Sequence, residues 1–253
     1  MKIKNGQLIM YKVNPKYRDF LRQFDYRVNE KNERKFYGIL LTNNNQDYCV
    51  PFTSKKQKKT NSKVTINIKQ DNKIIAKLLL NNMIPVNEKD LIIVDINEEK
   101  DKDYYIREIR YLRNKNVISE IINKSNYVFN NACNSKSKDY AFLSKICCNF
   151  PLLEEKCKLW NIIQDNIHTI NDYYSDNFEN SILKDIEVII YNSETKFELK
   201  EYAKTISENS AEYKKELDKL DYDKPLDDLK DAIVDIINRP LLSLNNDEEE
   251  DER

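Results

Sequence analysis

The sequence predicts an α+β fold, with a compact, mostly antiparallel sheet of about six strands, flanking helices and an acidic helical extension. Three observations predict it. Short apolar stretches separated by turn-forming residues fill the first hundred residues, and apolar residues at helical spacing follow. The charge then changes sign. Residues 1–160 carry 31 basic and 18 acidic side chains, a net charge of +13, whereas residues 161–253 carry 11 and 25, a net charge of −14.

The strands can be placed in order along the chain. Residues 7–13 form the first strand, and the turn-rich residues 42–47 join residues 36–41 and 48–52 as a hairpin. Gly38 inside this hairpin predicts either a bulge or a close backbone approach. The remaining strand candidates are residues 64–68, 74–80, 83–86 and 91–94.

Several helices have recognisable starts or faces. Asn14 and Pro15 predict a helix start, with the asparagine as N-cap and the proline in the first turn. Apolar residues at near-3.6 spacing predict further helices from about Tyr105, near Pro151 and from Leu226 onward. One predicted helix has a basic face that either follows a nucleic-acid backbone or is simply solvated. This face consists of Arg107, Arg110 and Arg113.

The charge pattern suggests three parts. We expect a basic core at residues 1–160, an acidic helical extension at residues 161–244, and a disordered acidic tail at residues 245–253. A basic body of this kind is typical of proteins that bind nucleic acid, although solvated faces of a charge-rich protein would give the same composition.

Composition also excludes several kinds of site. Two glycines in 253 residues leave no G-x-G-x-x-G motif and no P-loop. Five cysteines without a CxxC pair and a single histidine give no zinc-binding pattern, so we expect no metal and no cofactor. The cysteines suggest reduced thiols, and no apolar run is long enough to span a membrane. We therefore expect a cytoplasmic protein with no membrane partner.

The loop that follows the hairpin is the strongest chemical feature. It places Thr53 and Ser54 beside four lysines, Lys55, Lys56, Lys58 and Lys59. RNA can be cut without a metal when its 2′-hydroxyl attacks the neighbouring phosphate. The protein must then assist deprotonation, stabilise the extra phosphorane charge and help the leaving oxygen. Hydroxyls and lysines can supply these functions, but such a loop is more often an ordinary solvated turn.

Short motifs along residues 8–160 favour a catalytic role for this loop, because their order and spacing resemble the ToxN/AbiQ family of type III toxin–antitoxin endoribonucleases. The motifs are Tyr11-Lys12-Val13, Tyr17, Phe24-Asp25, Val28, Arg34-Lys35-Phe36-Tyr37-Gly38-Ile39, Pro51-Phe52-Thr53-Ser54-Lys55-Lys56, Asn81-Asn82-Met83-Ile84-Pro85-Val86, Tyr111-Leu112-Arg113 and Cys148-Asn149-Phe150-Pro151-Leu152-Leu153-Glu154-Glu155-Lys156.

The resemblance implies a twisted antiparallel sheet and a toxin that cleaves A-rich cellular or phage RNA without metal, leaving a 2′,3′-cyclic phosphate. It also implies an antiviral, abortive-infection role. The toxin would process a small repeat-derived RNA antitoxin, a pseudoknot, and be inhibited by it in a closed ring of alternating protein and RNA. The alternative is a non-catalytic RNA-binding protein that uses the same basic surface.

The resemblance assigns the catalytic site to Tyr17, Arg34, Thr53, Ser54 and Lys56. Because a guanidinium hardly deprotonates, Lys56 and Tyr17 are better candidates for proton transfer than Arg34. The expected RNA-binding residues are Lys35, Lys55, Lys58, Lys59, Arg107, Arg110 and Arg113. The acidic extension lies beyond the part of the chain that resembles the family. It either packs on the body and shapes a subunit contact, or it shields the basic surface as a phosphate mimic.

Overall fold

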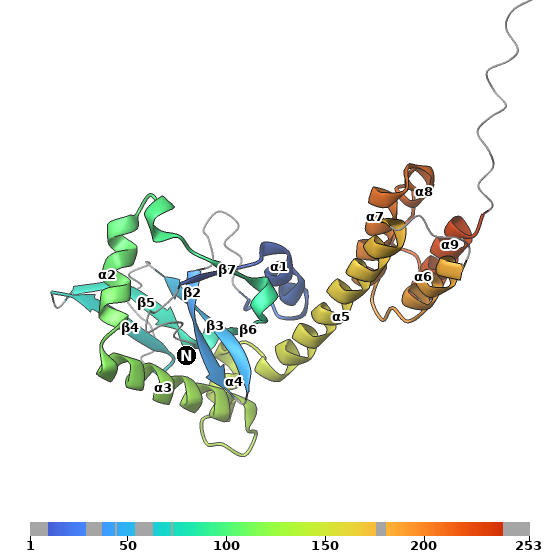
Figure 1. The fold of residues 1–253 in the computed structure, drawn as a ribbon. Coiled ribbons are helices and arrows are strands. Elements are labelled where there is room, and N and C mark those ends of the chain that lie inside the picture. The colour runs from blue at the N-terminus through green and yellow to red at the C-terminus, as the bar shows by residue number, and fades with distance from the viewer. Residues whose placement is uncertain are drawn as a thin grey trace, which may run out of the picture. The chain divides into compact units, whose positions relative to one another are not determined.

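The computed structural model describes residues 10–28, 37–43, 45–53, 63–71, 73–175 and 181–239. The chain divides into two units, Met1–Trp160 and Asn161–Arg253, and helix α5 (Phe150–Ser175) contributes residues to both (Figure 1). None of the described helices is both long and apolar enough to cross a membrane.

The first unit is built on an antiparallel sheet with seven strands among the described residues. The strand order is β4-β5-β3-β2-β1-β7, and β6 pairs with β3 at the side (Figure 1). This confirms the predicted α+β class. The strands are β1 (Tyr11–Val13), β2 (Tyr37–Asn43), β3 (Gln46–Thr53), β4 (Thr65–Gln70), β5 (Lys73–Leu79), β6 (Ile84–Pro85) and β7 (Leu91–Ile93).

The predicted hairpin is formed by β2 and β3, and Gly38 marks a close approach rather than a bulge. Its register is regular, with Gly38 opposite Pro51. A Cβ atom at Gly38 would lie 2.5 Å from the Cys49 sulfur and 2.5 Å from the Val50 carbonyl oxygen. Only glycine therefore fits at this position without moving the neighbouring strand.

Helix starts follow local capping chemistry. The Asn14 side chain accepts a hydrogen bond from the Lys16 amide at 3.0 Å, and Pro15 is the first residue of α1, as predicted. Asn114 caps α3 in the same way through the Asn116 amide. The helices of the first unit are α1 (Pro15–Phe24), α2 (Lys102–Leu112), α3 (Lys115–Cys133), α4 (Tyr140–Ile146) and the first part of α5.

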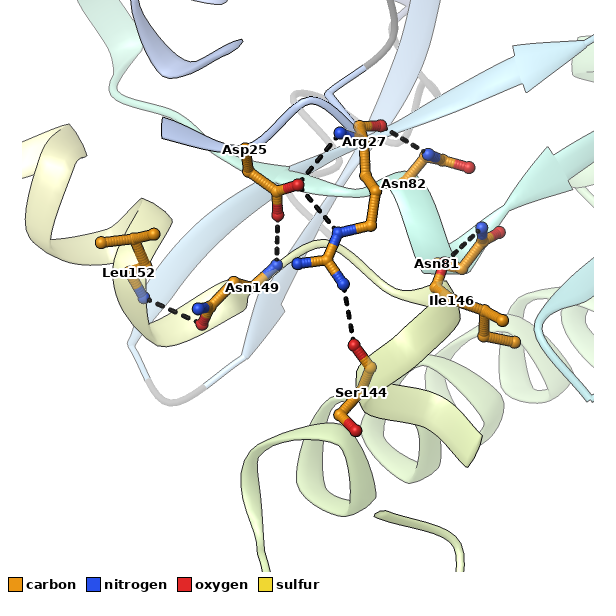
Figure 2. A network of polar contacts seen from close by, with 8 residues as sticks. All are labelled: Asp25, Arg27, Asn81, Asn82, Ser144, Ile146, Asn149 and Leu152. Atoms are coloured by element: carbon orange, nitrogen blue, oxygen red, sulfur yellow. Dashed lines mark hydrogen bonds and ion pairs between the residues drawn. The ribbon is translucent and has the colours of Figure 1, made fainter. Parts of the chain in front are cut away.

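A polar cluster joins the end of α1 to the junction of α4 and α5 (Figure 2). The buried Asp25 carboxylate accepts hydrogen bonds from the Arg27 amide, the Arg27 Nε and the Asn149 amide at 3.0, 2.8 and 2.6 Å. Arg27 Nη1 donates to the Ser144 carbonyl, and the Arg27 carbonyl accepts from Asn82 Nδ2. The cluster thus holds three separate segments of the chain together.

The second unit is helical in its described part. Its apolar core includes Ile186, Tyr202 and Ile206, and the stripe predicted on the last helix is buried at Leu229 and Ile233. The predicted acidic tail lies outside the described residues. Besides the end of α5, the helices are α6 (Ser181–Tyr191), α7 (Lys196–Asn209), α8 (Ala211–Leu217) and α9 (Leu226–Ile237).

Candidate functional site

The structure describes five of the residues predicted to act on RNA. These are Tyr17, Thr53, Arg107, Arg110 and Arg113. The other predicted residues lie outside the described part of the chain, namely Arg34, Lys35, Ser54, Lys55, Lys56, Lys58 and Lys59. Thr53 therefore marks the start of the predicted catalytic loop.

Thr53 is the last residue of β3 and is only 9% exposed. In the sheet it lies opposite Lys77 of β5, and Lys77 lies opposite Asn67 of β4. Directly paired residues project from the same face of an antiparallel sheet, so these three side chains form a polar row across three strands. We call Thr53, Lys77 and Asn67 the Thr53 row.

Sequence reasoning missed two members of this row, Lys77 and Asn67, and Lys77 carries the charge. The Lys77 side chain is 4% exposed, which is unusual for a lysine. A buried ammonium attracts an anion more strongly than an exposed one, because the surrounding dielectric is lower. A signal was present in the sequence, since Lys77 interrupts an otherwise apolar run from Ile74 to Leu80.

Asn67 adds an unsatisfied acceptor to the row. Its Oδ1 atom is buried and has no hydrogen-bond partner within the described segments. Buried polar atoms are nearly always paired, so an unpaired one at a polar row is a candidate contact for a bound group. The row therefore combines a cation, a hydroxyl and a free amide oxygen at the end of β3.

Tyr17, which was also predicted to be catalytic, lies in the core of the first unit. The ring is fully buried, and its hydroxyl donates to the Pro85 carbonyl at 2.7 Å. Pro85 pairs with Tyr48 near the start of β3, whereas Thr53 lies five residues further along that strand. At about 3.3 Å per residue, roughly 16 Å separates Thr53 from Tyr48. The structure therefore does not bring the Tyr17 hydroxyl to the Thr53 row.

Burial also makes Tyr17 a poor proton carrier. Loss of solvent is the main reason why the pKa of Tyr17 lies well above its ordinary value, and the nearby Cys157 and Asp90 raise it further. Its ring packs against the Trp160 ring with 5.5 Å between centroids. These contacts are those of a core residue that supports β3 from the side of α1 and α5.

The predicted basic face is exposed and begins near the Thr53 row. Arg107 and Arg110 on α2 and Arg113, its C-cap residue, are all exposed, and none forms an ion pair with another described residue. The Tyr104 hydroxyl on the same helix donates to the Ile75 carbonyl at 3.3 Å. Since Ile75 precedes Lys77 by two residues on β5, α2 starts beside the row. The three arginines extend about 9 Å along its axis.

A buried carboxyl lies on the opposite side of α2. Glu108 is 1% exposed, and its two carboxyl oxygens have no hydrogen-bond partner within the described segments. Burial raises the pKa of Glu108 to about 7, although the neighbouring Tyr104 phenol opposes this shift. Sequence reasoning missed Glu108 as well. It is inaccessible to RNA, so its effect is on the stability of α2.

Potential metal ligands do not gather in the described segments, where no group of three or more His, Cys, Asp or Glu side chains could hold an ion. The cysteines are mainly core residues. Burial raises the pKa of the Cys147 thiol to about 12 and that of the Cys133 thiol to about 11, so both stay protonated at neutral pH.

Comparison with known proteins agrees with the fold. Residues 9–158 match the family model described as toxin ToxN of type III toxin–antitoxin systems. The endoribonuclease ToxN of Bacillus thuringiensis subsp. kurstaki is 36% identical over 156 residues, which cover 58% of this chain and 80% of the relative. The endoribonuclease AbiQ of Lactococcus lactis subsp. lactis is 30% identical over 169 residues, which cover 61% and 90%.

Two solved structures share the fold of the first unit. One is from a study of selective toxin inhibition by a non-coding RNA pseudoknot in bacterial type III systems. It has a TM-score of 0.55 and 31% identity over 61% of this chain and 98% of the other. The second is AbiQ, a lactococcal anti-phage endoribonuclease, with a TM-score of 0.54 and 27% identity over 62% and 99%. The match to the family model ends at residue 158, near the boundary between the two units.

Proposed function

Because the chain belongs to the ToxN toxin family of type III toxin–antitoxin systems, we propose that it is an endoribonuclease toxin controlled by its own RNA antitoxin. The family match over residues 9–158 carries this proposal, since it spans the whole sheet unit and the Thr53 row. The curated relatives at 30% identity or more are both named endoribonucleases.

The proposed reaction is attack by the 2′-hydroxyl of RNA on the adjacent phosphate, without metal. The bond from phosphorus to the 5′-oxygen breaks, and a 2′,3′-cyclic phosphate remains. Thr53 and Ser54 would donate hydrogen bonds to the phosphoryl oxygens, while Arg34 offsets the added charge. Lys56 is our candidate for proton transfer, because an ammonium can lose and regain a proton and a guanidinium hardly can.

Two residues receive a revised or new role. We assign Tyr17 to positioning, because it is buried and bonded to Pro85. Lys77 acts as a buried positive charge beside Thr53, and it supports the phosphorane charge from within the sheet. The exposed arginines of α2 and the remaining loop lysines contact the RNA backbone, as expected for basic side chains with no sequence preference of their own.

The finer features rest on the family resemblance and on the relatives. A non-coding RNA pseudoknot inhibits one relative, and AbiQ is described as an anti-phage enzyme. We therefore propose inhibition by a repeat-derived pseudoknot RNA that the toxin itself processes. We further propose a closed ring of protein and RNA, a preference for A-rich cellular or phage sites, an abortive-infection role and a cytoplasmic location.

Cleavage in the presence of EDTA tests the enzyme assignment. Purified protein is incubated with A-rich RNA, and the product ends are checked for a cyclic phosphate. We expect cleavage that Ser54→Ala and Lys56→Ala each slow by about 100-fold or more, as is usual for the loss of an acid–base or charge-stabilising group. Intact RNA with the wild type would instead favour the non-catalytic RNA-binding protein. Full cleavage by both variants would overturn the site.

The genome offers a second test of the two alternatives. A type III antitoxin is encoded by tandem short repeats directly upstream of the toxin gene, so such repeats favour the toxin. A non-catalytic RNA-binding protein does not require them.

A further inference from the structure

One surface outside the Thr53 row brings two exposed aromatic rings together around an ion pair. Lys63 Nζ lies 3.1 Å from Asp139 Oδ1 and 5.8 Å from the centroid of the Phe142 ring. The Tyr127 hydroxyl donates to the other Asp139 carboxylate oxygen. Tyr127 and Phe142 nevertheless remain 38% and 37% exposed. We call these four residues the Lys63 cluster.

The cluster holds its rings in place. Tyr127 lies on α3, Phe142 lies on α4, and Asp139 precedes α4 as its N-cap residue. The pKa of Asp139 lies below its ordinary value because Tyr127 and Lys63 both donate hydrogen bonds to it, so the carboxylate stays charged at neutral pH. Rings that are already ordered lose less conformational entropy when a ligand stacks on them.

The charge of the surrounding segment favours an anionic partner. Residues 121–153 contain a single acidic side chain, Asp139, which is neutralised by Lys63. They also contain four lysines, Lys124, Lys136, Lys138 and Lys145. Exposed aromatic rings beside lysines suit single-stranded RNA, whose bases stack while its phosphates meet the cations. An acidic peptide or a lipid surface would bind the lysines but would not require two exposed aromatic rings.

The cluster lies close enough to the Thr53 row to share one RNA strand with it. Thr65, the first residue of β4, follows Lys63 by two positions and precedes Asn67 of the row by two. Two strand spacings and two residues along β4 put Thr65 roughly 12 Å from Thr53, and Lys63, two residues before Thr65, lies within about 7 Å of Thr65. A strand that enters the row can therefore place a flanking base on the cluster.

We propose that Tyr127 and Phe142 form a stacking platform for one unpaired base of the substrate RNA, a few nucleotides from the bond that is cut. This inference rests on the proposed endoribonuclease function. It adds a base-binding subsite whose position depends on the Lys63–Asp139 ion pair.

The test uses an A-rich single-stranded RNA that is 2′-O-methylated so that it cannot be cut. One adenine at a time is replaced by 2-aminopurine, whose fluorescence falls when it stacks. We expect quenching at one position on the full-length wild type. Tyr127→Ala and Phe142→Ala should each abolish the quenching and weaken binding by about 5- to 100-fold, without changing the salt dependence.

Matched variants separate stacking from folding. Tyr127→Phe and Phe142→Tyr keep a ring and should bind like the wild type. Tyr191→Ala removes a ring that is 48% exposed in the second unit and should have no effect. Thermal unfolding shows whether each variant is folded.

Each remaining outcome has a definite meaning. Binding without quenching at any position, or equal binding by the alanine variants, would overturn the platform while leaving the proposed function intact. Failure of the wild type to bind any RNA would overturn both proposals. If the alanine variants lose affinity only for the repeat-derived RNA, the occupant is the antitoxin, and the substrate assignment is wrong.

Discussion

Glu108 shows at the residue scale how one buried carboxyl links pH to stability. The pKa of Glu108 in the folded protein is about 7, against an ordinary value of 4.5. Below pH 4.5 both folded and unfolded states are protonated, so the group has no effect. As the pH rises from 4.5 to 7 the unfolded state loses its proton first, and the free energy of unfolding falls.

Glu108→Gln should remove this loss, because an amide stays neutral at every pH. We expect the variant to be more stable than the wild type by about 3 kcal/mol at pH 8, and similar to it at pH 4. Denaturant unfolding of both proteins between these two pH values measures the difference. A constant difference across the range would show that Glu108 does not titrate in this window.

Lys77→Met tests the buried charge of the Thr53 row. Methionine has a similar length and no charge, so the sheet should remain folded while the phosphorane charge loses support. We expect RNA cleavage to slow by about tenfold or more, and Lys77→Arg to recover part of the rate. Single-turnover cleavage measures the rate, and circular dichroism checks the fold. Wild-type cleavage by Lys77→Met would exclude Lys77 from the site.

Glu108 and Tyr17 differ in what the sequence could tell about their burial and position. Glu108 shares a helix face with Leu112 four residues later, so its burial could have been inferred from periodicity. The position of Tyr17 could not, because it depends on its bond to Pro85, 68 residues further along the chain. Local patterns predict which face of a helix is buried, but they do not show which distant strand covers it.

At the scale of elements, the predicted strands and helix starts were accurate because each had a local cause. Alternating apolar residues predicted β4, a short apolar run predicted β5, and the Asn14–Pro15 pair predicted the start of α1. The order of the strands had no such cause. It arises from pairings such as that of β1 with β7, which are far apart in sequence. The Thr53 row also depends on this order, so its three members could not be grouped in advance.

The cluster in Figure 2 gives a structural role to three of the motifs that resembled the toxin family. Asp25, Asn82 and Asn149 belong to different motifs: Asp25 and Asn82 bond to Arg27, and the Asn149 amide donates to the Asp25 carboxylate. In this chain, these three motifs therefore contribute to packing between the end of α1, the segment at Asn82 and the junction of α4 and α5.

Asp25→Asn should therefore weaken the packing between elements. It leaves the Arg27 guanidinium without its charged partner and turns an acceptor into a donor near the Asn149 amide. We expect the free energy of unfolding to fall by about 2–4 kcal/mol, as for other broken buried pairs.

Denaturant unfolding measures this loss. Glu155→Ala provides the control, because it removes the exposed pair with Lys156 and should change stability by about 0.5 kcal/mol or less. Equal effects of the two variants would show that the Figure 2 cluster contributes no more than a surface ion pair.

For the whole molecule, the division of charge is the feature most open to experiment. Residues 1–175 carry 31 basic and 20 acidic side chains, a net charge of +11, whereas the full chain has a net charge of −1. Like charges on the extension and on RNA repel each other over about 30 Å at 0.01 M ionic strength, but over only a few ångströms near 1 M. The extension should therefore slow the encounter with RNA wherever its helices lie.

Deleting residues 176–253 should accelerate RNA association by about tenfold or more at low ionic strength, because the remaining basic unit attracts the phosphates. Stopped-flow mixing with labelled RNA measures the rate. The faster association of the shortened chain should disappear at 0.5 M salt if the repulsion is long-range. An advantage that persists at high salt would indicate instead that the extension covers the RNA surface directly.

A charge variant of the intact chain separates repulsion from the loss of the helices themselves. Asp227, Asp228 and Asp235 are exposed on α9, and their replacement by Asn removes three negative charges while keeping the helix. If long-range repulsion acts, this variant should associate with RNA at a rate between those of the full and shortened chains. Its faster association relative to the full chain should also disappear at 0.5 M salt. If this variant matches the full chain while the deletion accelerates binding, the helices act by contact rather than by the charge of these aspartates, and the packing role becomes the better explanation.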